Sequence, residues 1–163
     1  HIIKRGDRLG VRLKDSEHPN RINFRGIERY PVDKRWRITA RYVPYESPRT
    51  ITVPTVTGID EETAPGWLEF AINDKTFTLE PLGEPDSQSL FIIFGDQTNG
   101  RETYGGGRFL YANNPGQAGE TIIDFNKAYN PPCVFTPYAT CPLPPEQNKL
   151  AIKITAGEKV YSH

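Results

Sequence analysis

The chain has 163 residues, enough for one domain with a substantial hydrophobic core. Its 20 basic and 20 acidic side chains cancel, which argues against nucleic acid as the main partner, because phosphate binding favours a strong positive excess. No apolar run approaches the roughly 18 residues that a membrane-spanning helix needs, so we expect no membrane span in this chain.

The start of the chain predicts an upstream region. The first residue is His1, methionine is absent, and the opening residues already have the pattern of a strand. The segment Asp15–Asn20 is the best candidate for a boundary. We therefore expect residues 1–15 to be the end of a missing or trimmed upstream region, and residues 16–163 to form a single β domain.

Short strands separated by turns are predicted along nearly the whole chain. The first two strands flank Arg5-Gly6-Asp7-Arg8, a hairpin signal. Asn99-Gly100 is a favoured hairpin turn pair and leads through Glu102–Tyr104 into the strand that follows. In chain order, the predicted strands are Ile2–Lys4, Leu9–Leu13, Trp36–Tyr42, Thr50–Val56, Leu68–Ile72, Thr76–Leu79, Leu90–Phe94, Arg108–Tyr111, Thr121–Phe125 and Leu150–Ile154.

These strands predict an all-β fold, either an antiparallel β-sandwich or a β-barrel of about nine or ten short strands. The pattern does not separate the two architectures, and both stay open. The last strand has the clearest two-residue period, since Leu150, Ile152 and Ile154 alternate with small or charged residues. No window has the apolar stripe of a helix.

The segment from Asp124 to Pro145 has the most unusual composition. It contains six of the 15 prolines, both cysteines and four of the 16 Phe and Tyr residues. Proline excludes helix interiors and central strands, and disordered segments lack aromatic residues. We therefore predict a long, ordered, proline-rich loop, a kind of segment that is often functional. Cys133 and Cys141 within it are expected to form a disulfide or a pair of thiols.

Polar residues near this loop form the candidate ligand site. Glu102, Tyr104 and Arg108 share one predicted strand face, and Asp124 is expected to pair with Arg108 from a neighbouring strand. A bulge at the three glycines 105–107 would change the face of Arg108. The structural alternative is that these charges only form a paired polar patch. The predicted ligand-binding residues are Arg101, Glu102, Tyr104, Arg108, Asp124, Asn126, Tyr129 and Asn130.

Catalysis by a histidine-activated nucleophile is excluded from the centre of the fold. The three histidines, His1, His18 and His163, lie at the chain ends or in the boundary loop. Glu102 and Asp124 stay open as candidate general bases. No metal-ligand spacing and no cofactor motif is present, since glycines 105–107 lead into a predicted strand rather than the helix that a phosphate loop needs.

Several motifs resemble the bacterial and archaeal family catalogued as domain of unknown function 1684. The resemblance covers nearly the whole chain, and its most specific motif is Asp124–Pro145. It implies that the polar residues and the proline-rich loop belong to one unit, but it implies no activity. The other motifs are Lys4–Arg8, Phe24–Ile27, Tyr30-Pro31, Gly95–Tyr104, Gly107–Leu110 and Ala156–Lys159.

Three functional hypotheses follow. The leading one is a β-domain that binds a small polar or anionic ligand, or a peptide, under the 124–145 loop. The alternative is a hydrolase or isomerase with a carboxylate general base. The third is a purely architectural domain whose loop plugs one end of the sheet.

Overall fold

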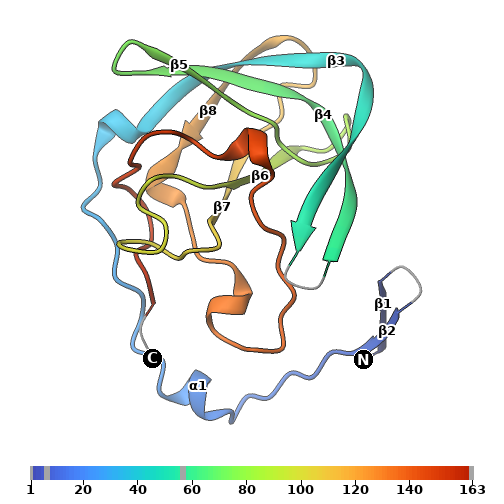
Figure 1. Ribbon diagram of the computed structural model, residues 1–163, viewed down its shortest axis with the longest axis vertical. Coiled ribbons are helices and arrows are strands. Elements are labelled where there is room, and N and C mark those ends of the chain that lie inside the picture. The colour runs from blue at the N-terminus through green and yellow to red at the C-terminus, as the bar shows by residue number, and fades with distance from the viewer. Residues whose placement is uncertain (1, 6–7, 56–57, 162–163) are drawn as a thin grey trace.

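A computed structural model describes residues 2–5, 8–55 and 58–161 of the chain. Within these ranges the protein has eight strands, one short helix and four turns of 3-10 helix (Figure 1). The predicted all-β class is confirmed, and the strand count is close to the predicted one. Among the helices in these ranges, none has the length and apolar character to cross a membrane.

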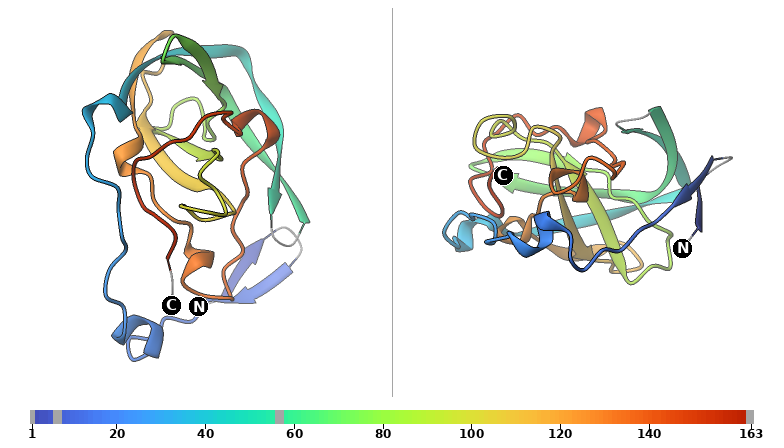
Figure 2. Two further views of the ribbon diagram at one scale, coloured as in Figure 1. Left: turned by 60° about the vertical axis from the view of Figure 1, so that its left-hand side comes forward. Right: turned by 90° about the horizontal axis from the view of Figure 1, so that it is seen from below.

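The main sheet has four antiparallel strands in the order β5–β4–β3–β8, and it curls into a half-barrel (Figures 1 and 2). Strands β6 and β7 form a separate antiparallel pair whose apolar side chains join the same core. The bounds are β3 Arg37–Thr55, β4 Gly58–Ile72, β5 Lys75–Leu79, β6 Ser89–Phe94, β7 Arg108–Asn113 and β8 Gly119–Asp124.

The remaining elements are short. Two strands near the N-terminus pair with each other and with no other strand that the structure describes. The N-terminal strap, residues 24–36, runs beside the C-terminal segment, residues 149–160, where the N–H of Tyr30 donates to the carbonyl of Gly157 (Figure 2). The bounds are β1 Ile2–Arg5, β2 Arg8–Val11, α1 Pro19–Ile22, η1 Lys34–Trp36, η2 Phe125–Lys127, η3 Pro132–Val134 and η4 Glu146–Asn148.

The core lies between the inner face of the main sheet and the β6–β7 pair. Strand alternation directs Tyr42 of β3 and Leu68 of β4 to this inner face, and both are buried. Phe125, directly after β8, lies among them with its ring centroid 5.2 Å from that of Phe94. Burying each such large apolar side chain stabilises the fold by about 1.5–3 kcal/mol.

Two of the predicted strands belong to one element. Trp36–Tyr42 and Thr50–Val56 were expected to be separate, but β3 contains residues 37–42 and 50–55 without reversing, while Val56 lies outside the described residues. The pairing with β4 shifts register between Pro44 and Arg49, which is a bulge. Prolines cannot donate to the sheet ladder, so a bulge in this stretch lets the strand continue past them.

The prediction of a strand at Leu150–Ile154 is wrong, and so is the prediction that Glu102 and Tyr104 lie on a strand face, because both lie in the loop between β6 and β7. Leu150 and Ile154 are buried, as the alternation indicates, but the backbone here is irregular. It bonds to the turn after β6, where the N–H of Leu150 donates to the carbonyl of Gly95 at 2.8 Å. The alternating burial of residues 150–154 therefore comes from an extended segment that packs against a turn and pairs with no strand in the described part of the chain.

The end of the proline-rich segment packs against the long β3–β4 hairpin. The N–H of Leu143 donates to the carbonyl of Pro54 at 2.7 Å, beside an isolated bridge between Thr55 and Pro142. Within residues 131–145 the regular structure is one 3-10 turn and this one isolated bridge. The segment is thus held by backbone contacts, which its proline residues still permit.

Candidate functional site

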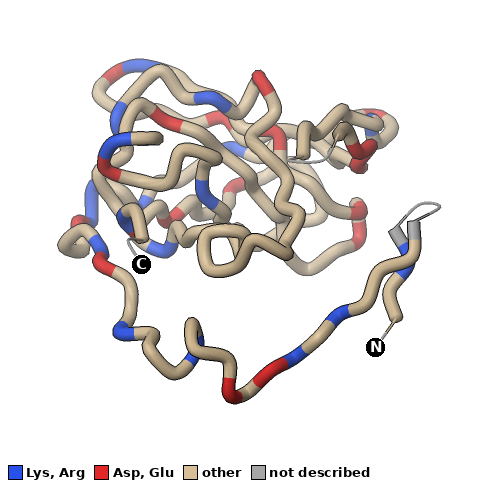
Figure 3. Tube along the Cα trace, turned by 60° about the horizontal axis from the view of Figure 1, so that its bottom comes forward, with Lys and Arg blue, Asp and Glu red and all other residues tan. Residues whose placement is uncertain are grey.

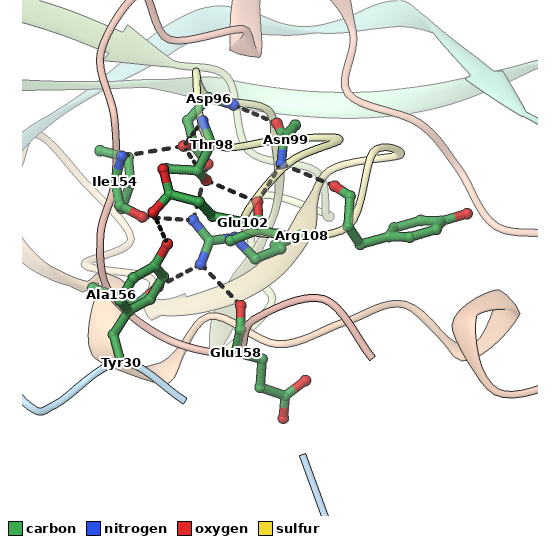
Figure 4. Close-up of polar contacts among 11 residues, drawn as sticks. Tyr30, Asp96, Thr98, Asn99, Glu102, Arg108, Ile154, Ala156 and Glu158 are labelled. Carbon is green, nitrogen blue, oxygen red and sulfur yellow. Dashed lines mark hydrogen bonds and ion pairs between the residues drawn. The ribbon is translucent and has the colours of Figure 1, made fainter. Parts of the chain in front are cut away.

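Arg108, the first residue of β7, is completely buried beneath the C-terminal segment (Figure 4). Its Nη2 atom lies 2.9 Å from Oδ2 of Asp96, whose side chain is equally buried. The guanidinium also donates to three backbone carbonyls, those of Ile154, Ala156 and Glu158. Burial of a charge is tolerated when the charge is paired and hydrogen-bonded, and Arg108 meets both conditions.

Asp96 organises the tight loop that follows β6, which we call the Asp96 loop (residues 95–104). Its Oδ1 atom accepts hydrogen bonds from the N–H of Thr98 at 2.9 Å and from the N–H of Ile154 at 3.1 Å. The hydroxyls of Thr98 and Thr103 lie 2.8 Å apart, and the side-chain amide of Asn99 donates to Thr103. One carboxylate therefore fixes both the loop and the C-terminal segment.

The predicted pair of Arg108 with Asp124 is wrong, because Arg108 pairs with Asp96. Strand β8 pairs with β3 and not with β7, so Asp124 lies opposite Arg37. The Asp124 carboxylate accepts from the N–H and the side-chain amide of Asn126, at 3.2 and 2.9 Å. It therefore caps the turn η2.

Asn126 holds the N-terminal strap against the body of the protein. Its side-chain amide donates to the carbonyl of Asp33 at 2.9 Å, and its Oδ1 atom accepts from the N–H of Asp33 at 3.0 Å. Asp124 and Asn126, both predicted to bind a ligand, thus use polar atoms in contacts within the protein.

A second buried carboxylate, Glu158, ties three segments together. Its Oε1 atom lies 2.8 Å from Nη2 of Arg29 in the strap, and its Oε2 atom accepts from the N–H of Asn130 at 2.6 Å. The Asn130 side chain donates to the carbonyl of Lys159 at 2.9 Å. Asn130 is buried, so this predicted binding residue is also engaged by the fold.

Glu102 lies at the surface of the Asp96 loop. Its carboxylate accepts from the hydroxyl of Tyr30 at 2.8 Å (Figure 4). It also lies 3.4 Å from Nζ of Lys153. These two hydrogen bonds, first that from Tyr30, hold the pKa of Glu102 below its usual value. A general base that works near neutral pH is favoured by a raised pKa, so this geometry does not favour a general-base role. The neighbouring Arg101 is exposed.

Tyr104 and the two cysteines meet where the proline-rich segment packs on the Asp96 loop. The Tyr104 hydroxyl lies 3.6 Å from Sγ of Cys133, and the N–H of Cys133 lies 3.2 Å from Sγ of Cys141. Both are free thiols in the structure. The contact with Cys133, together with burial, raises the pKa of Tyr104 to about 12. Tyr129 stands apart, stacked on Tyr111.

A cleft of about 580 Å³ lies between the Asp96 loop, glycines 105–107 and the end of the proline-rich segment. Its walls are residues of the segments 95–99, 105–107, 143–144 and 149–151, with Pro54 at the end of β3. None of the eight predicted binding residues, all of which the structure describes, lines it. Within the described ranges, no cluster of three or more His, Cys, Asp or Glu side chains is placed to hold a metal ion.

Two glycines let the proline-rich segment approach this closely. Gly107 has a φ of +82°, and a Cβ atom there would lie 2.6 Å from the carbonyl oxygen of Phe94 and overlap Pro144. A Cβ atom on Gly106 would lie 2.5 Å from the ring of Tyr104. These glycines therefore permit close packing of the loop.

The buried carboxylates Asp96 and Glu158 were not among the predicted site residues. A single acidic residue in a turn gives no sequence signal of burial, because Asp and Glu are almost always exposed. The nearest signal was that both lie in motifs that carry the family resemblance. Lys149, directly before the predicted strand Leu150–Ile154, was also not among the predicted site residues.

The chain matches the family model described as protein of unknown function (DUF1684) over residues 22–159. It belongs to this family. Its fold is similar to the solution NMR structure of the uncharacterized protein from gene locus rrnAC0354 of Haloarcula marismortui, at 28% sequence identity. The TM-score is 0.70, and the match covers 85% of this chain and 78% of that one. No curated protein matches the chain.

Proposed function

We propose that this DUF1684 domain binds a small polar or anionic ligand in the cleft beneath Leu143 and Pro144. The observation that carries the proposal is the cleft itself, whose volume of about 580 Å³ is typical of small-molecule sites. The proposal keeps the ligand class expected from the sequence. The proposed site differs from the predicted one, because the residues that line the cleft are not the polar residues predicted from the sequence.

The cleft offers hydrogen-bond donors to a ligand. The N–H groups of Gly105 and Gly106, two residues of its lining, donate to no backbone acceptor in the part of the chain that the structure describes. Gln97 is exposed and contributes an amide. Lys149 contributes an ammonium group, whose other contact is the exposed Glu146 at 2.5 Å. This donor set suits a carboxylate, phosphate or sugar hydroxyl.

The negative charge of Asp96 in the cleft lining does not oppose the binding of an anion. Asp96 is the acidic residue in the lining, but its side chain is completely buried and paired with Arg108. Its negative charge is therefore largely compensated before it reaches a ligand. Lys149 is left as the charged group at the cleft surface.

The test is a thermal-shift screen of the protein against anionic metabolites, sugars, short peptides and divalent metals. A ligand present at a hundred times its Kd stabilises the fold by about 2.7 kcal/mol, which should raise the Tm by roughly 5–10 °C. Hits are then repeated with Lys149→Gln and, as a matched control, with Lys153→Gln. Lys153 contacts Glu102 and lies outside the cleft.

Loss of the Tm shift in Lys149→Gln alone supports a site in the cleft. Loss in Lys153→Gln alone would instead favour a site at Glu102, one of the residues predicted from the sequence. No shift across the screen, with the protein folded, would favour the architectural hypothesis.

A further inference from the structure

A pocket separate from this cleft opens at the bulge of β3. Residues 45–48 of β3 lie opposite the single residue Pro65 of β4, and β3 bends sharply along its length (Figure 1). The pocket has a volume of about 400 Å³ and is lined by Pro44, Tyr45, Glu46, Ser47, Arg49 and Trp67. It shares no lining residue with the cleft.

Two aromatic rings form the wall of this pocket. The ring centroids of Tyr45 and Trp67 lie 5.2 Å apart with their planes tilted by 46°. Both side chains are half-buried. Trp67 projects from the face of β4 that points away from the core, because the adjacent Leu68 is buried in the core. The Tyr45 hydroxyl lies 2.5 Å from the carboxylate of Glu80, which fixes the orientation of its ring.

A cation already lies on one of these rings. The guanidinium carbon of Arg49 is 4.0 Å from the centroid of the Tyr45 ring, close enough for a cation–π interaction. Arg49 is exposed and lies at the end of the bulge. The chain therefore places its own positive group where a ligand cation would sit.

The carboxylates around the rings also favour a cation. Glu46 lines the pocket and Glu80 accepts a hydrogen bond from Tyr45, so two acidic residues adjoin a pocket whose one basic lining residue is Arg49. We infer that this pocket binds a quaternary ammonium group, which displaces Arg49 from the face of Tyr45. Tryptophan and tyrosine faces are the preferred partners of such groups.

Trp67 can report on binding directly. The chain has two tryptophans, so the variant Trp36→Phe leaves Trp67 as the single source of tryptophan fluorescence. This variant is titrated with choline up to about 50 mM, a range that detects millimolar binding. The matched titrant is 3,3-dimethyl-1-butanol, which has the shape of choline without its charge. We expect choline to change the Trp67 emission and the neutral analogue to leave it nearly unchanged.

Substitution of Arg49 should change the affinity for choline in a defined direction. Arg49→Ala removes the competing cation and should tighten choline binding about 2–5-fold, whereas Glu46→Gln should weaken it by a similar factor. Arg41→Ala is the matched control, because Arg41 pairs with Glu69 and lies outside the pocket. It should leave the Kd unchanged.

Three results would overturn the inference: no response to choline from the folded protein, an equal response to the neutral analogue, or weaker binding by Arg49→Ala. If choline binds as expected, a peptide with trimethyl-lysine and vesicles of phosphatidylcholine are compared next. Whichever of the peptide and the vesicles binds with the lower Kd identifies the source of the ammonium group.

Discussion

At the scale of single residues, Arg108 makes its contacts inside the protein. Its guanidinium bonds to Asp96 and to three carbonyls of the C-terminal segment, and no part of it is exposed. Removing one member of a buried ion pair leaves the other charge uncompensated, which is strongly destabilising. We therefore expect Arg108 to stabilise the folded protein.

Arg108→Met, which keeps much of the side-chain volume, should lower the free energy of unfolding by about 3–5 kcal/mol. Chemical denaturation measures this loss. Arg101→Met is the matched control, since Arg101 is exposed and its substitution should change stability by no more than about 0.5 kcal/mol. Equal stabilities of the two variants would contradict the structural role of Arg108.

A second prediction at this scale concerns Glu102. The hydrogen bond from Tyr30 holds the pKa of Glu102 below its ordinary value of 4.5. Tyr30→Phe removes this bond, so the pKa of Glu102 should rise. An NMR titration of the Glu102 carboxyl carbon measures the change, with the exposed Tyr138→Phe as control. An unchanged pKa would show that Tyr30 does not donate to Glu102 in solution.

At the scale of elements, the Asp96 loop, the C-terminal segment and the proline-rich segment depend on one another. Asp96 bonds to the loop and to Ile154, and Gly107 lets Pro144 pack on the end of the loop. The cleft forms where these irregular segments meet. Its shape therefore depends on close backbone packing.

Gly107→Ala tests that packing. The added Cβ atom would lie 2.6 Å from the carbonyl oxygen of Phe94, in a backbone conformation that alanine rarely adopts. We expect a loss of about 2–4 kcal/mol in the free energy of unfolding. Gly105→Ala, whose nearest contact is 3.6 Å away, should cost much less. A well-tolerated Gly107→Ala would contradict the described packing.

The parts of the main sheet that line the core were predictable because their alternation matches a sheet with one buried face, whereas residues 58–67 of β4 lay outside the predicted strands. The sequence pattern of Leu150–Ile154 was equally regular, yet this segment has no sheet neighbour. Period-2 burial requires only an extended backbone against an apolar surface. Pairing partners depend on topology, which the local pattern does not contain.

The candidate site was less predictable than the fold. Strand parity placed Asp124 near Arg108, but the true partner, Asp96, lies in a turn outside any alternation pattern. The cleft was partly anticipated, because residues of the proline-rich segment cover it. Its other walls come from Pro54, glycines 105–107 and residues of the segments 95–99 and 149–151. These segments are far apart in the sequence, so no local pattern joins them.

At the scale of the whole molecule, basic and acidic residues are interspersed along the trace (Figure 3). The net charge of zero fits this distribution. Many of the ionic contacts connect segments distant in sequence, such as Arg29 with Glu158 and Lys153 with Glu102. These contacts join the N-terminal strap, the Asp96 loop and the C-terminal segment into one body.

Four tyrosines make the stability of this body sensitive to alkali. The pKa values of Tyr30, Tyr45, Tyr104 and Tyr129 are each raised from 10.0 to about 12, by burial in three cases and first by the Cys133 contact at Tyr104. Phenols of the unfolded chain lose their protons near pH 10, before those of the folded chain. Their contribution to stability is therefore complete below about pH 10 and is lost as the pH rises towards 12.

Phenolate absorbance during an alkaline titration, with unfolding followed by circular dichroism, checks this prediction. We expect a late-titrating group of tyrosines that ionises together with unfolding. Tyr104→Phe should reduce this group by one. Ionisation of all tyrosines near pH 10 in the folded protein would contradict the burial of these phenols.

The central claim is that the cleft under Leu143 and Pro144 binds a ligand, and a two-dimensional amide NMR spectrum tests it most directly. The spectrum is recorded with inorganic phosphate and with the most stabilising compound of the thermal-shift screen. We predict shifts of the Gly105, Gly106 and Ala151 signals. The signals of Asn126 and Asn130 should stay in place. Shifts confined to those two asparagines, or no shifts at all, would contradict the claim.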